Sequence, residues 1–456
     1  MFFGNYIETF RGAKIQVVCV ICASLNAISD AMHVSWSAPS TSLLLDEDSP
    51  FDVEEKYIVW LELLLTMFSI LGLPLTIYLA NKLGPKMSIL ISSCTSAAAW
   101  ILIGVGNTKE YLFAARCLAG AAVDATFISS PTYISEIANK NIRGSLVCIG
   151  YVMFHSGIIV MYSVGAQTSL RIPPIVGICI IVMQLLTLPF FPESPYYHIR
   201  EKNEEAARKS LMVFQEKEKV ETELSRIVEE VQQEGKKTRF RDLFSSRENR
   251  KMAFIILILY AGPPLTGHVA VLMNLHTILE SVDITFLTPY AAALLYSSVM
   301  LTASVLSALL VDKFGRKILI NISTFFSGVS LLSLGVYIHM KHLQFDMNGF
   351  AWIPLVSING YAAFFKLGLG TLYILIGSEV CPPNIRTLVL AAADFLYNTF
   401  WFVSVYTYHY LNEHYGLPVS FYVFSFFSIF VLILNIFFIP ETKGKTSQEI
   451  QAMLQG

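Results

Sequence analysis

The sequence predicts an all-α membrane protein with twelve transmembrane helices in two six-helix halves, joined by a helical linker. Three observations predict this class. Only 14% of the 456 residues are charged and 54% are hydrophobic, whereas soluble domains carry about 25% charged residues. Twelve stretches are long and apolar enough to cross a bilayer. Pairs of short motifs recur in the same order in both halves.

The apolar stretches predict helices because lipid offers the backbone no hydrogen-bond partners, so each segment must bond within itself. A spanning helix needs about 20 residues, whereas the strands of a membrane barrel are alternating segments of about ten. Runs of the helical length therefore exclude the barrel. The expected spans are 13–36, 57–80, 87–106, 110–134, 143–165, 172–191, 250–275, 286–311, 317–339, 351–377, 387–410 and 417–439.

A charged segment separates the sixth and seventh spans. From Arg200 to Lys251 the chain has 14 Lys/Arg and 12 Asp/Glu residues. Its few apolar residues follow helical spacing, which predicts amphipathic helices on a membrane face. The expected division is an N-terminal six-helix half at 1–193, a linker at 194–250 and a C-terminal six-helix half at 251–456.

Basic residues of the short loops gather on alternate connections, and these include Lys82, Lys86, Arg143 and Lys313. The loop "LLLDEDSPFDVEEK", on the other set, is acidic. Because short cytoplasmic loops carry an excess of Lys and Arg, both termini and the linker are expected to be cytoplasmic.

An internal repeat organises the chain. The segment Asn81–Lys86, "NKLGPK", recurs as Asp312–Lys317, "DKFGRK". "SEIANKNIRG" recurs as "SEVCPPNIRT", and "PESP" recurs as "PETK". Two six-helix halves related by such a repeat are typical of transporters.

These motifs resemble those of the major facilitator superfamily, sugar porter branch, and the chain looks most like the insect facilitative trehalose and hexose transporters. "DKFGRK" resembles the D-R-x-G-R-R/K loop between spans 8 and 9, and Glu136 with Arg143 resembles E-x6-R-G. Pro192–Pro195 and Pro440–Gly444 resemble the signatures that close each half. The resemblance implies the major facilitator fold and a carrier in the plasma membrane that works as a monomer, by alternating access.

Carboxylates and guanidinium groups at helix ends can form bidentate bonds between neighbouring helices. Such bonds would act as a conformational latch if they formed in only one global state. The expected latch residues are Arg116, Glu136, Arg143 and Glu193 in the first half, and Asp312, Arg316, Glu379, Arg386 and Glu441 in the second. Asn81 and Pro85 replace the family's Asp and Arg, which predicts a weaker latch in the first half. For Lys82, Lys86 and Lys317, simple anchoring at the membrane face is an equal alternative.

The solute path departs from the family pattern. The family's glutamine on span 5 is Tyr151 here, and its Q-Q-L-S-G-I-N on span 7 is Pro263–Val269. Each amide-to-hydroxyl bond contributes about 0.5–1.5 kcal/mol, so other groups must replace the missing amides. The candidates for solute binding are Tyr151, His155, Thr266, Gly267, His268, Asn274, Asn359, Tyr373, Asn398 and Trp401. The alternative for each polar member is an ordinary interhelical hydrogen bond.

The stretch "LYAGPPLTGHVAVLMN" lies in the seventh span and contains Pro263, Pro264 and Gly267. Proline removes a helix hydrogen bond and clashes with the preceding turn, so the sequence predicts a bend here.

Four ionisable residues fall inside predicted spans, namely Asp30, Asp124, Lys366 and Asp394. An intramembrane charge indicates function by default. A desolvated carboxylate can couple transport to protons, while a structural ion pair, such as Lys366 with Asp394 or Asp30, is the alternative.

The sequence and the resemblance together favour facilitated diffusion of a sugar of the hexose or trehalose type. The alternatives are a carrier of another small polar solute, a proton-coupled symporter, and a nutrient sensor that does not transport. The sequence shows no metal-ligand cluster and no phosphate-binding loop, and its net charge is −2. We therefore expect no enzyme activity, no cofactor, no metal and no nucleic-acid partner. The expected partners are a small polar solute and the lipid bilayer.

Overall fold

The computed structural model describes residues 14–46, 49–51, 53–139, 142–165, 169–215, 217–234, 247–282, 287–381, 386–445, 449–450 and 453. Within these residues twelve helices are long and apolar enough to cross a membrane, and no strand occurs. The prediction of an all-α protein with twelve spanning helices is confirmed. The spans begin and end close to the predicted positions.

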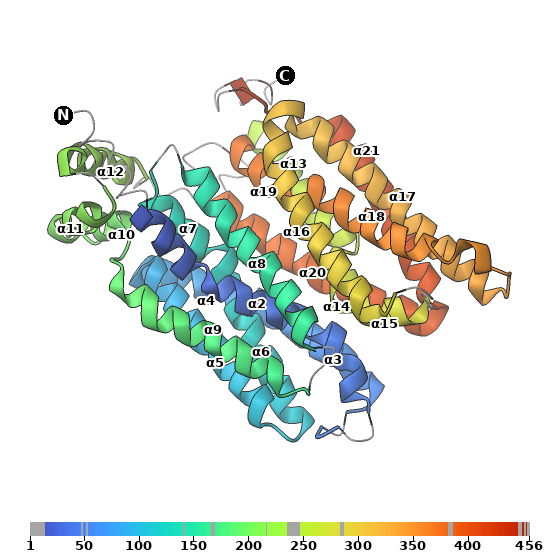
Figure 1. Cartoon of the computed structure of the whole chain (residues 1–456). Helices are drawn as coiled ribbons and strands as arrows, with labels where there is room; N and C mark the ends of the chain where they lie inside the picture. Colours follow the sequence, from blue (N-terminus) through green and yellow to red (C-terminus); the bar gives the residue numbers. More distant parts are fainter. Residues whose placement is uncertain are drawn as a thin grey trace. The chain divides into compact units, whose positions relative to one another are not determined.

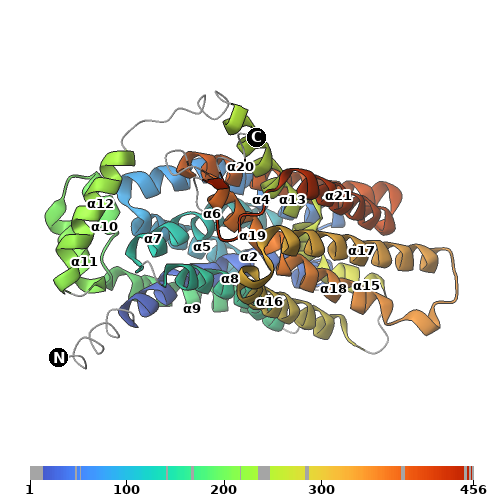
Figure 2. The same cartoon turned by 90° about the horizontal axis from the view of Figure 1, so that it is seen from above.

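The chain divides into two compact units, drawn in Figures 1 and 2. Unit 1 comprises Met1–Trp36 and Ser42–Lys237, and unit 2 comprises Ser37–Thr41 and Thr238–Gly456. The linker helices are counted with unit 1. The three-part division at residues 193 and 250 stays a prediction.

Unit 1 contains the first six spans, Lys14–Ser35, Glu55–Leu83, Pro85–Val105, Lys109–Ile137, Leu146–Gly165 and Ile172–Phe190. Their helices are α2 (Leu25–Ser35), α4 (Glu55–Leu83), α5 (Pro85–Val105), α6 (Lys109–Phe127), α7 (Ser129–Ile137), α8 (Arg143–Gly165) and α9 (Ile172–Thr187), with the 3₁₀ turn η1 (Leu188–Phe190). The short helix α3 (Ser37–Leu44) follows α2. The helix α4 packs against α6, α5 packs against α6 and α9, and α2 packs against α8 and α9.

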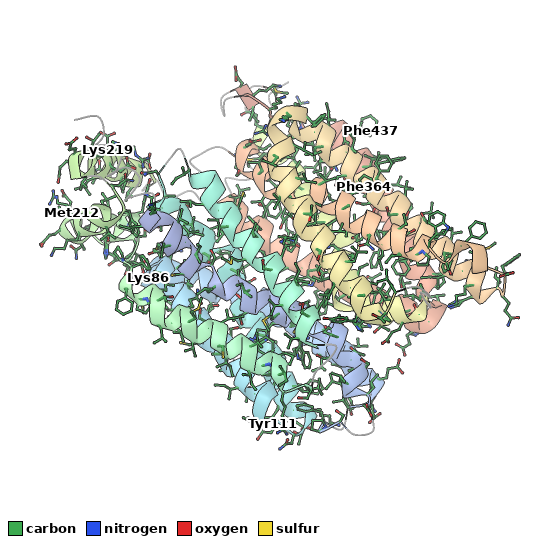
Figure 3. All side chains as sticks on the ribbon, viewed as in Figure 1. Lys86, Tyr111, Met212, Lys219, Phe364 and Phe437 are labelled. Carbon is green, nitrogen blue, oxygen red and sulfur yellow. The ribbon has the colours of Figure 1, made fainter. Side chains whose placement is uncertain are left out.

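The predicted amphipathic linker forms α10 (Pro195–Arg200), α11 (Glu204–Phe214), the turn η2 (Lys217–Lys219) and α12 (Val220–Glu234). Their apolar faces share a small core that includes Tyr196, Leu211 and Leu224. Figure 3 marks these helices by Met212 and Lys219. The Gln16 side chain ties them to the first span, because its Nε2 donates to the Phe214 carbonyl at 2.8 Å.

Unit 2 contains the other six spans, Arg247–Met273, Pro289–Val311, Arg316–His342, Ile353–Val380, Val389–Tyr415 and Leu417–Phe438. Their helices are α13 (Arg247–Leu265), α14 (His268–Met273), α15 (Leu275–Ser281), α16 (Pro289–Phe314), α17 (Arg316–His342), the turn η4 (Asn348–Phe350), α18 (Ile353–Leu367), α19 (Leu369–Val380), α20 (Arg386–Tyr415) and α21 (Leu417–Phe438). The helix α17 packs against α18 and α21, while α13 packs against α19 and α20.

The tenth span is broken at Gly368, between α18 and α19. A broken helix inside a membrane requires partners for the backbone groups that it frees. The Ser323 hydroxyl of α17 supplies them, since it donates to the Phe364 carbonyl at 2.6 Å and accepts from the Leu369 N–H at 2.8 Å. The break is therefore a bonded feature of the fold.

Candidate functional site

The seventh span breaks between α13 and α14, where the sequence predicts a bend. Pro263 and Pro264 lie in the last turn of α13, and Gly267 takes a left-handed conformation with φ of 79°. A Cβ atom at Gly267 would lie 2.4 Å from the Phe424 ring. Only glycine fits here without strain, both because of the backbone conformation and because of the space.

Side chains bind the backbone freed by this break. The Thr266 hydroxyl donates to the Pro263 carbonyl at 2.8 Å, and the Tyr361 hydroxyl of α18 donates to the Thr266 carbonyl at 3.0 Å. The Asn274 amide donates to the Ala270 carbonyl of its own helix at 3.1 Å. The side-chain donors of Thr266 and Asn274 thus already serve the broken helix.

An aromatic cluster lies beside α13 and is formed by Tyr260, Tyr373, Tyr397 and Trp401. The Tyr373 and Tyr397 rings are stacked, with centroids 5.5 Å apart and an interplanar angle of 7°. Tyr260 meets Tyr373 edge-on at 5.1 Å, and Tyr397 meets Trp401 edge-on at 6.4 Å. The indole nitrogen of Trp401 is buried and has no hydrogen-bond partner within the described residues. The cluster offers flat apolar faces, phenol hydroxyls and the indole donor of Trp401, which suits the apolar face and hydroxyls of a sugar.

Tyr397 was not among the residues predicted from the sequence. It precedes Trp401 by four positions on α20, so both side chains lie on one helix face. This spacing was the signal that could have identified it. Asn398, which was predicted, is also buried on α20.

His268, at the start of α14, stacks on Phe365 with ring centroids 4.2 Å apart. The Lys366 ammonium lies 5.5 Å from the centroid of the same Phe365 ring. No ion pair joins Lys366 to Asp394 within the part of the chain that the structure describes, so the alternative of a structural pair between these two residues is not seen. Lys366 and His268 instead share one aromatic neighbour.

In unit 1, Tyr151 and His155 lie one turn apart on α8, where the His155 ring nitrogen Nδ1 contacts the Tyr151 carbonyl at 2.7 Å. In unit 2, the Asn359 amide donates to the Leu355 carbonyl one turn earlier on α18, at 2.8 Å. The side chains of His155 and Asn359 thus each have a local bond on their own helix.

Asp30 lies at the centre of a buried polar network in unit 1. Its carboxylate accepts from the Thr126 hydroxyl at 2.6 Å and from the Ser96 hydroxyl at 3.3 Å. Asn26 donates to Thr126 at 2.8 Å and accepts from Gln184 at 3.3 Å. The network connects α2, α5, α6 and α9, and a buried carboxyl with hydroxyl partners is able to hold or release a proton.

The Asp124 carboxylate, on α6, accepts from the Ser69 hydroxyl of α4 at 3.0 Å. This bond joins two neighbouring spanning helices of unit 1.

Arg116 is placed away from the other latch candidates of the first half. Its guanidinium is fully buried, donates to the His33 carbonyl at 2.6 Å, and lies 4.7 Å from the Trp36 ring centroid. Glu136 is 20 residues further along the same span, which corresponds to about 30 Å of helix. The structure thus does not bring Arg116 to the Glu136 end of the span.

Two glutamates of the closing signatures bind helix ends in matching ways. In unit 1, Glu193 accepts from the backbone N–H groups of Lys86 and Met87 at 3.0 and 3.2 Å. In unit 2, Glu441 accepts from the N–H groups of Arg316 and Lys317, both at 3.0 Å. Each carboxylate thereby caps the free N–H groups and the positive dipole end of a spanning helix, α5 or α17.

Glycines make room for these caps. Gly84 and Gly315 precede α5 and α17 with φ of 96° and 90°. A Cβ atom would lie 2.5 Å from the Glu193 carboxylate at the first position and 2.8 Å from the Glu441 carboxylate at the second. The repeat of "LGPK" and "FGRK" therefore encodes one carboxylate cap in each half.

Ion pairs lie beside the Glu193 and Glu441 caps. Arg316 donates to the Glu379 carboxylate at 3.2 Å, as expected for two latch candidates. Glu136 is paired with Arg200 at 3.2 Å and accepts from the Ser194 hydroxyl. Arg200, on the linker, was not predicted. The side chains of Arg143, Asp312 and Arg386 lie outside the described residues.

Residues 18–454 match the model of the protein family described as "Sugar (and other) transporter". The facilitated trehalose transporter Tret1 of Bombyx mori is 28% identical over 433 residues, covering 93% of this chain and 84% of that protein. The sugar transporter ERD6-like 6 of Arabidopsis thaliana is 28% identical over 459 residues, covering 98% and 92%.

Among solved structures, the chain is similar to the major facilitator superfamily proton:xylose symporter XylE bound to 6-bromo-6-deoxy-D-glucose, with a TM-score of 0.74 and 21% identity. That match covers 97% of this chain and 99% of the other. A partially occluded inward-open form of XylE from E. coli gives a TM-score of 0.78 at 20% identity, covering 94% and 99%. The predicted major facilitator fold is confirmed.

Proposed function

The chain belongs to the sugar (and other) transporter family, and from this premise we propose that it carries a sugar of the hexose or trehalose type across the plasma membrane. It works as a monomer by facilitated diffusion and alternating access, with both termini cytoplasmic. The similarity to the trehalose transporters of insects supports the solute class.

The aromatic cluster of Tyr260, Tyr373, Tyr397 and Trp401 carries this proposal on the structural side. A carrier needs polar groups that are available to the solute, and the side chains of four predicted candidates already bond to their own helices, those of His155, Thr266, Asn274 and Asn359. The indole N–H of Trp401, next to stacked tyrosine rings, is buried without a hydrogen-bond partner within the described residues. Burying such a donor without a partner costs about 1–3 kcal/mol, which a bound hydroxyl would offset.

The test is a radiolabelled uptake panel of glucose, fructose, trehalose and polyols in cells that lack endogenous sugar carriers. We expect saturable uptake of one sugar, with a reduction of about tenfold in uptake efficiency for Trp401→Phe, which removes the indole donor but keeps an aromatic ring. Trp352→Phe, at an exposed tryptophan of the same unit, is the matched control. Uptake of no sugar, with normal expression at the cell surface, would contradict the proposal and favour another polar solute or a sensor.

Proton-coupled symport is the second candidate function, because Asp30 is buried among Ser96, Thr126 and Asn26. In proteoliposomes, facilitated diffusion predicts the same final sugar level with or without a pH gradient between about pH 5.5 and 7.5. Accumulation driven by the gradient and abolished in Asp30→Asn would instead establish coupling.

A further inference from the structure

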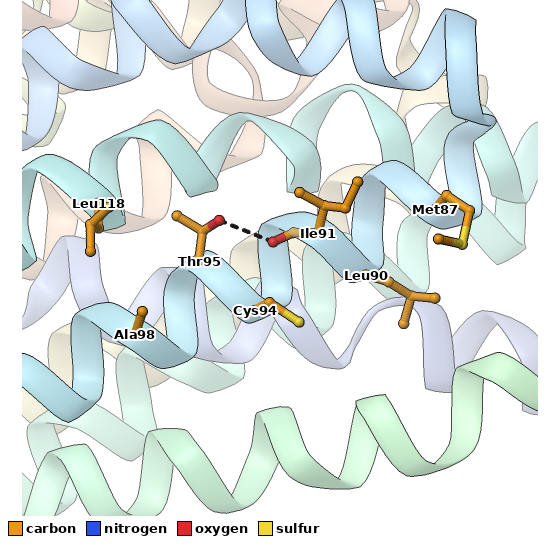
Figure 4. Close-up of a pocket in the computed structure, with 7 residues that line it drawn as sticks. All are labelled: Met87, Leu90, Ile91, Cys94, Thr95, Ala98 and Leu118. Carbon is orange, nitrogen blue, oxygen red and sulfur yellow. Dashed lines mark hydrogen bonds between the residues drawn. The ribbon is translucent and has the colours of Figure 1, made fainter.

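The surface of unit 1 carries an apolar groove that none of the candidate transport residues lines. It runs along α5 from Met87 through Leu90 and Cys94 to Ala98, and Leu118 of α6 forms part of its wall (Figure 4). Its volume is about 470 Å³. The hydroxyl of Thr95, which also lines it, donates to the Ile91 carbonyl at 3.0 Å. The groove therefore presents mainly hydrocarbon surface.

The internal repeat shows that the small side chains of this groove occur only in the first half at these aligned positions. Gly84 and Gly315 share one backbone conformation, with ψ of 154° and 155°, and each precedes a helix capped by a glutamate. These caps align α5 with α17 residue by residue. Cys94, Thr95 and Ala98 then correspond to Phe325, Phe326 and Val329.

The second half thus places large side chains where the first half has small ones. Phe325, Phe326 and Val329 are 48%, 40% and 44% exposed, so they project from the surface of α17. Replacing such side chains by cysteine, threonine and alanine leaves a channel along a helix that crosses the membrane. If this channel were empty, the atoms that line it would lose dispersion contacts. We therefore expect lipid hydrocarbon to fill it.

Charges at one end of the groove indicate the headgroup. Lys86 adjoins Met87, and Lys82 lies at the end of α4. The Lys86 ammonium donates to the Phe191 carbonyl and the Lys82 ammonium donates to the Tyr78 hydroxyl, both at 2.8 Å. An ammonium has three donors, so each keeps capacity for an anion. No acidic residue occurs from Asn81 to Val105, and the Glu193 carboxylate beside Lys86 is already bound by the Lys86 and Met87 N–H groups.

We propose that the α5–α6 groove is a binding site for an acidic phospholipid, with one acyl chain lying along Met87–Ala98 and the headgroup at Lys82 and Lys86. The lipid completes the surface of the first half, as Phe325 and Phe326 do in the second. Basic residues near a membrane surface favour an anionic lipid over a zwitterionic one.

The test uses the full chain in nanodiscs that contain phosphatidylserine or phosphatidylcholine with a diazirine on the acyl chain. After photolysis, labelled peptides are mapped by mass spectrometry. We expect phosphatidylserine to label Met87–Ala98 severalfold more than Ile318–Val329 of α17 in the same molecule. We also expect phosphatidylserine to label the α5 stretch about fivefold more than phosphatidylcholine does.

The double variant Cys94→Phe/Thr95→Phe places the residues of the second half in the groove, and its α5 labelling should fall to the α17 level. Ile101→Phe, at a 49% exposed position of α5 outside the groove lining, is the matched control and should keep the labelling. Equal labelling of α5 and α17, equal labelling by the two lipids, or unchanged labelling in the double variant would overturn the proposal. The first two comparisons use the unaltered protein, so they hold even if the double variant does not fold.

Discussion

Glu193 and Glu441 perform the same task in different surroundings. Burial raises the pKa of Glu193, although the N–H groups of Ser194, Lys86 and Met87 partly oppose this. Burial also disfavours the charged form of Glu441, but the N–H groups of Lys443, Lys317 and Arg316 outweigh it and lower the pKa of that carboxyl. Ionised Glu441 is therefore favoured by the fold, whereas ionised Glu193 is penalised by it.

Glu441→Gln should lower the stability of the fold at neutral pH by about 1 kcal/mol, because the amide keeps an acceptor but loses the charge at the α17 N-terminus. A carboxyl whose folded pKa lies below its unfolded value, about 4.3 for glutamate, stabilises the fold above that value. The contribution is lost as the pH falls through the folded pKa. Thermal unfolding midpoints should thus differ at pH 7 and converge below about pH 4.

The exposed Glu413→Gln on α20 is the matched control for Glu441→Gln and should show little difference at either pH. Glu193→Gln should cost less than Glu441→Gln at pH 7, because the substitution also removes a charge that burial penalises. A difference between Glu441→Gln and the unaltered protein that stays constant across pH would contradict a role for the charge.

At the scale of helices, a substitution can test whether backbone conformation and side-chain packing together fix the break in the seventh span. Gly267→Ala should destabilise the protein by about 2–5 kcal/mol, from a left-handed backbone (about 1–2 kcal/mol) and from overpacking against Phe424 (about 1–3 kcal/mol). Gly444→Ala is the matched control, because Gly444 also has a positive φ, of 68°, but open space around it. Thermal unfolding of the purified protein measures both.

The double variant Gly267→Ala/Phe424→Leu separates the two contributions. If the clash matters, the smaller side chain at 424 should recover part of the loss. Equal destabilisation by Gly267→Ala and Gly444→Ala would show instead that packing against Phe424 does not hold the break.

The sequence predicted the spans well because hydrocarbon imposes one requirement on about 20 residues at a time. It predicted the bend at Pro263 and Pro264 because proline acts on its own helix. It did not predict the break at Gly368, whose freed backbone groups are bound by Ser323, 45 residues earlier on another helix. Such partners depend on tertiary packing, which the local pattern does not contain.

The same dependence on tertiary packing explains why the structure brings together only some of the predicted site residues. The repeated glutamates fall on equivalent helix ends because internal repeats preserve position. The prediction grouped Arg116 with Glu136 because both carry charges suited to ion pairs. The helix rise over the residues between them places the two side chains at different ends of the span. Gln184 bonds to side chains of other helices and belongs to no motif, whereas the four-residue spacing of Tyr397 and Trp401 was a local signal.

For the whole molecule, alternating access requires contacts whose strength differs between global states. The Arg316–Glu379 pair joins the start of α17 to the end of α19, and its side chains are only 12% and 23% exposed. If the pair forms in one state alone, its loss shifts the balance between states, and about 1.4 kcal/mol would change their ratio tenfold. Glu441 binds the backbone of Arg316, so a side-chain substitution leaves that bond in place.

A double-mutant cycle on Arg316→Gln and Glu379→Gln tests this role. Each single variant should lower the initial uptake rate of the sugar found by the panel. The uptake rate of the double variant should be no lower than that of either single variant. The expected coupling is about 1–2 kcal/mol for a partly buried contact pair. The matched cycle on Glu204→Gln and Arg208→Gln, an exposed pair on α11, should give nearly zero. Additive effects at Arg316 and Glu379 would mean that the two residues act separately, and the pair would then be no latch.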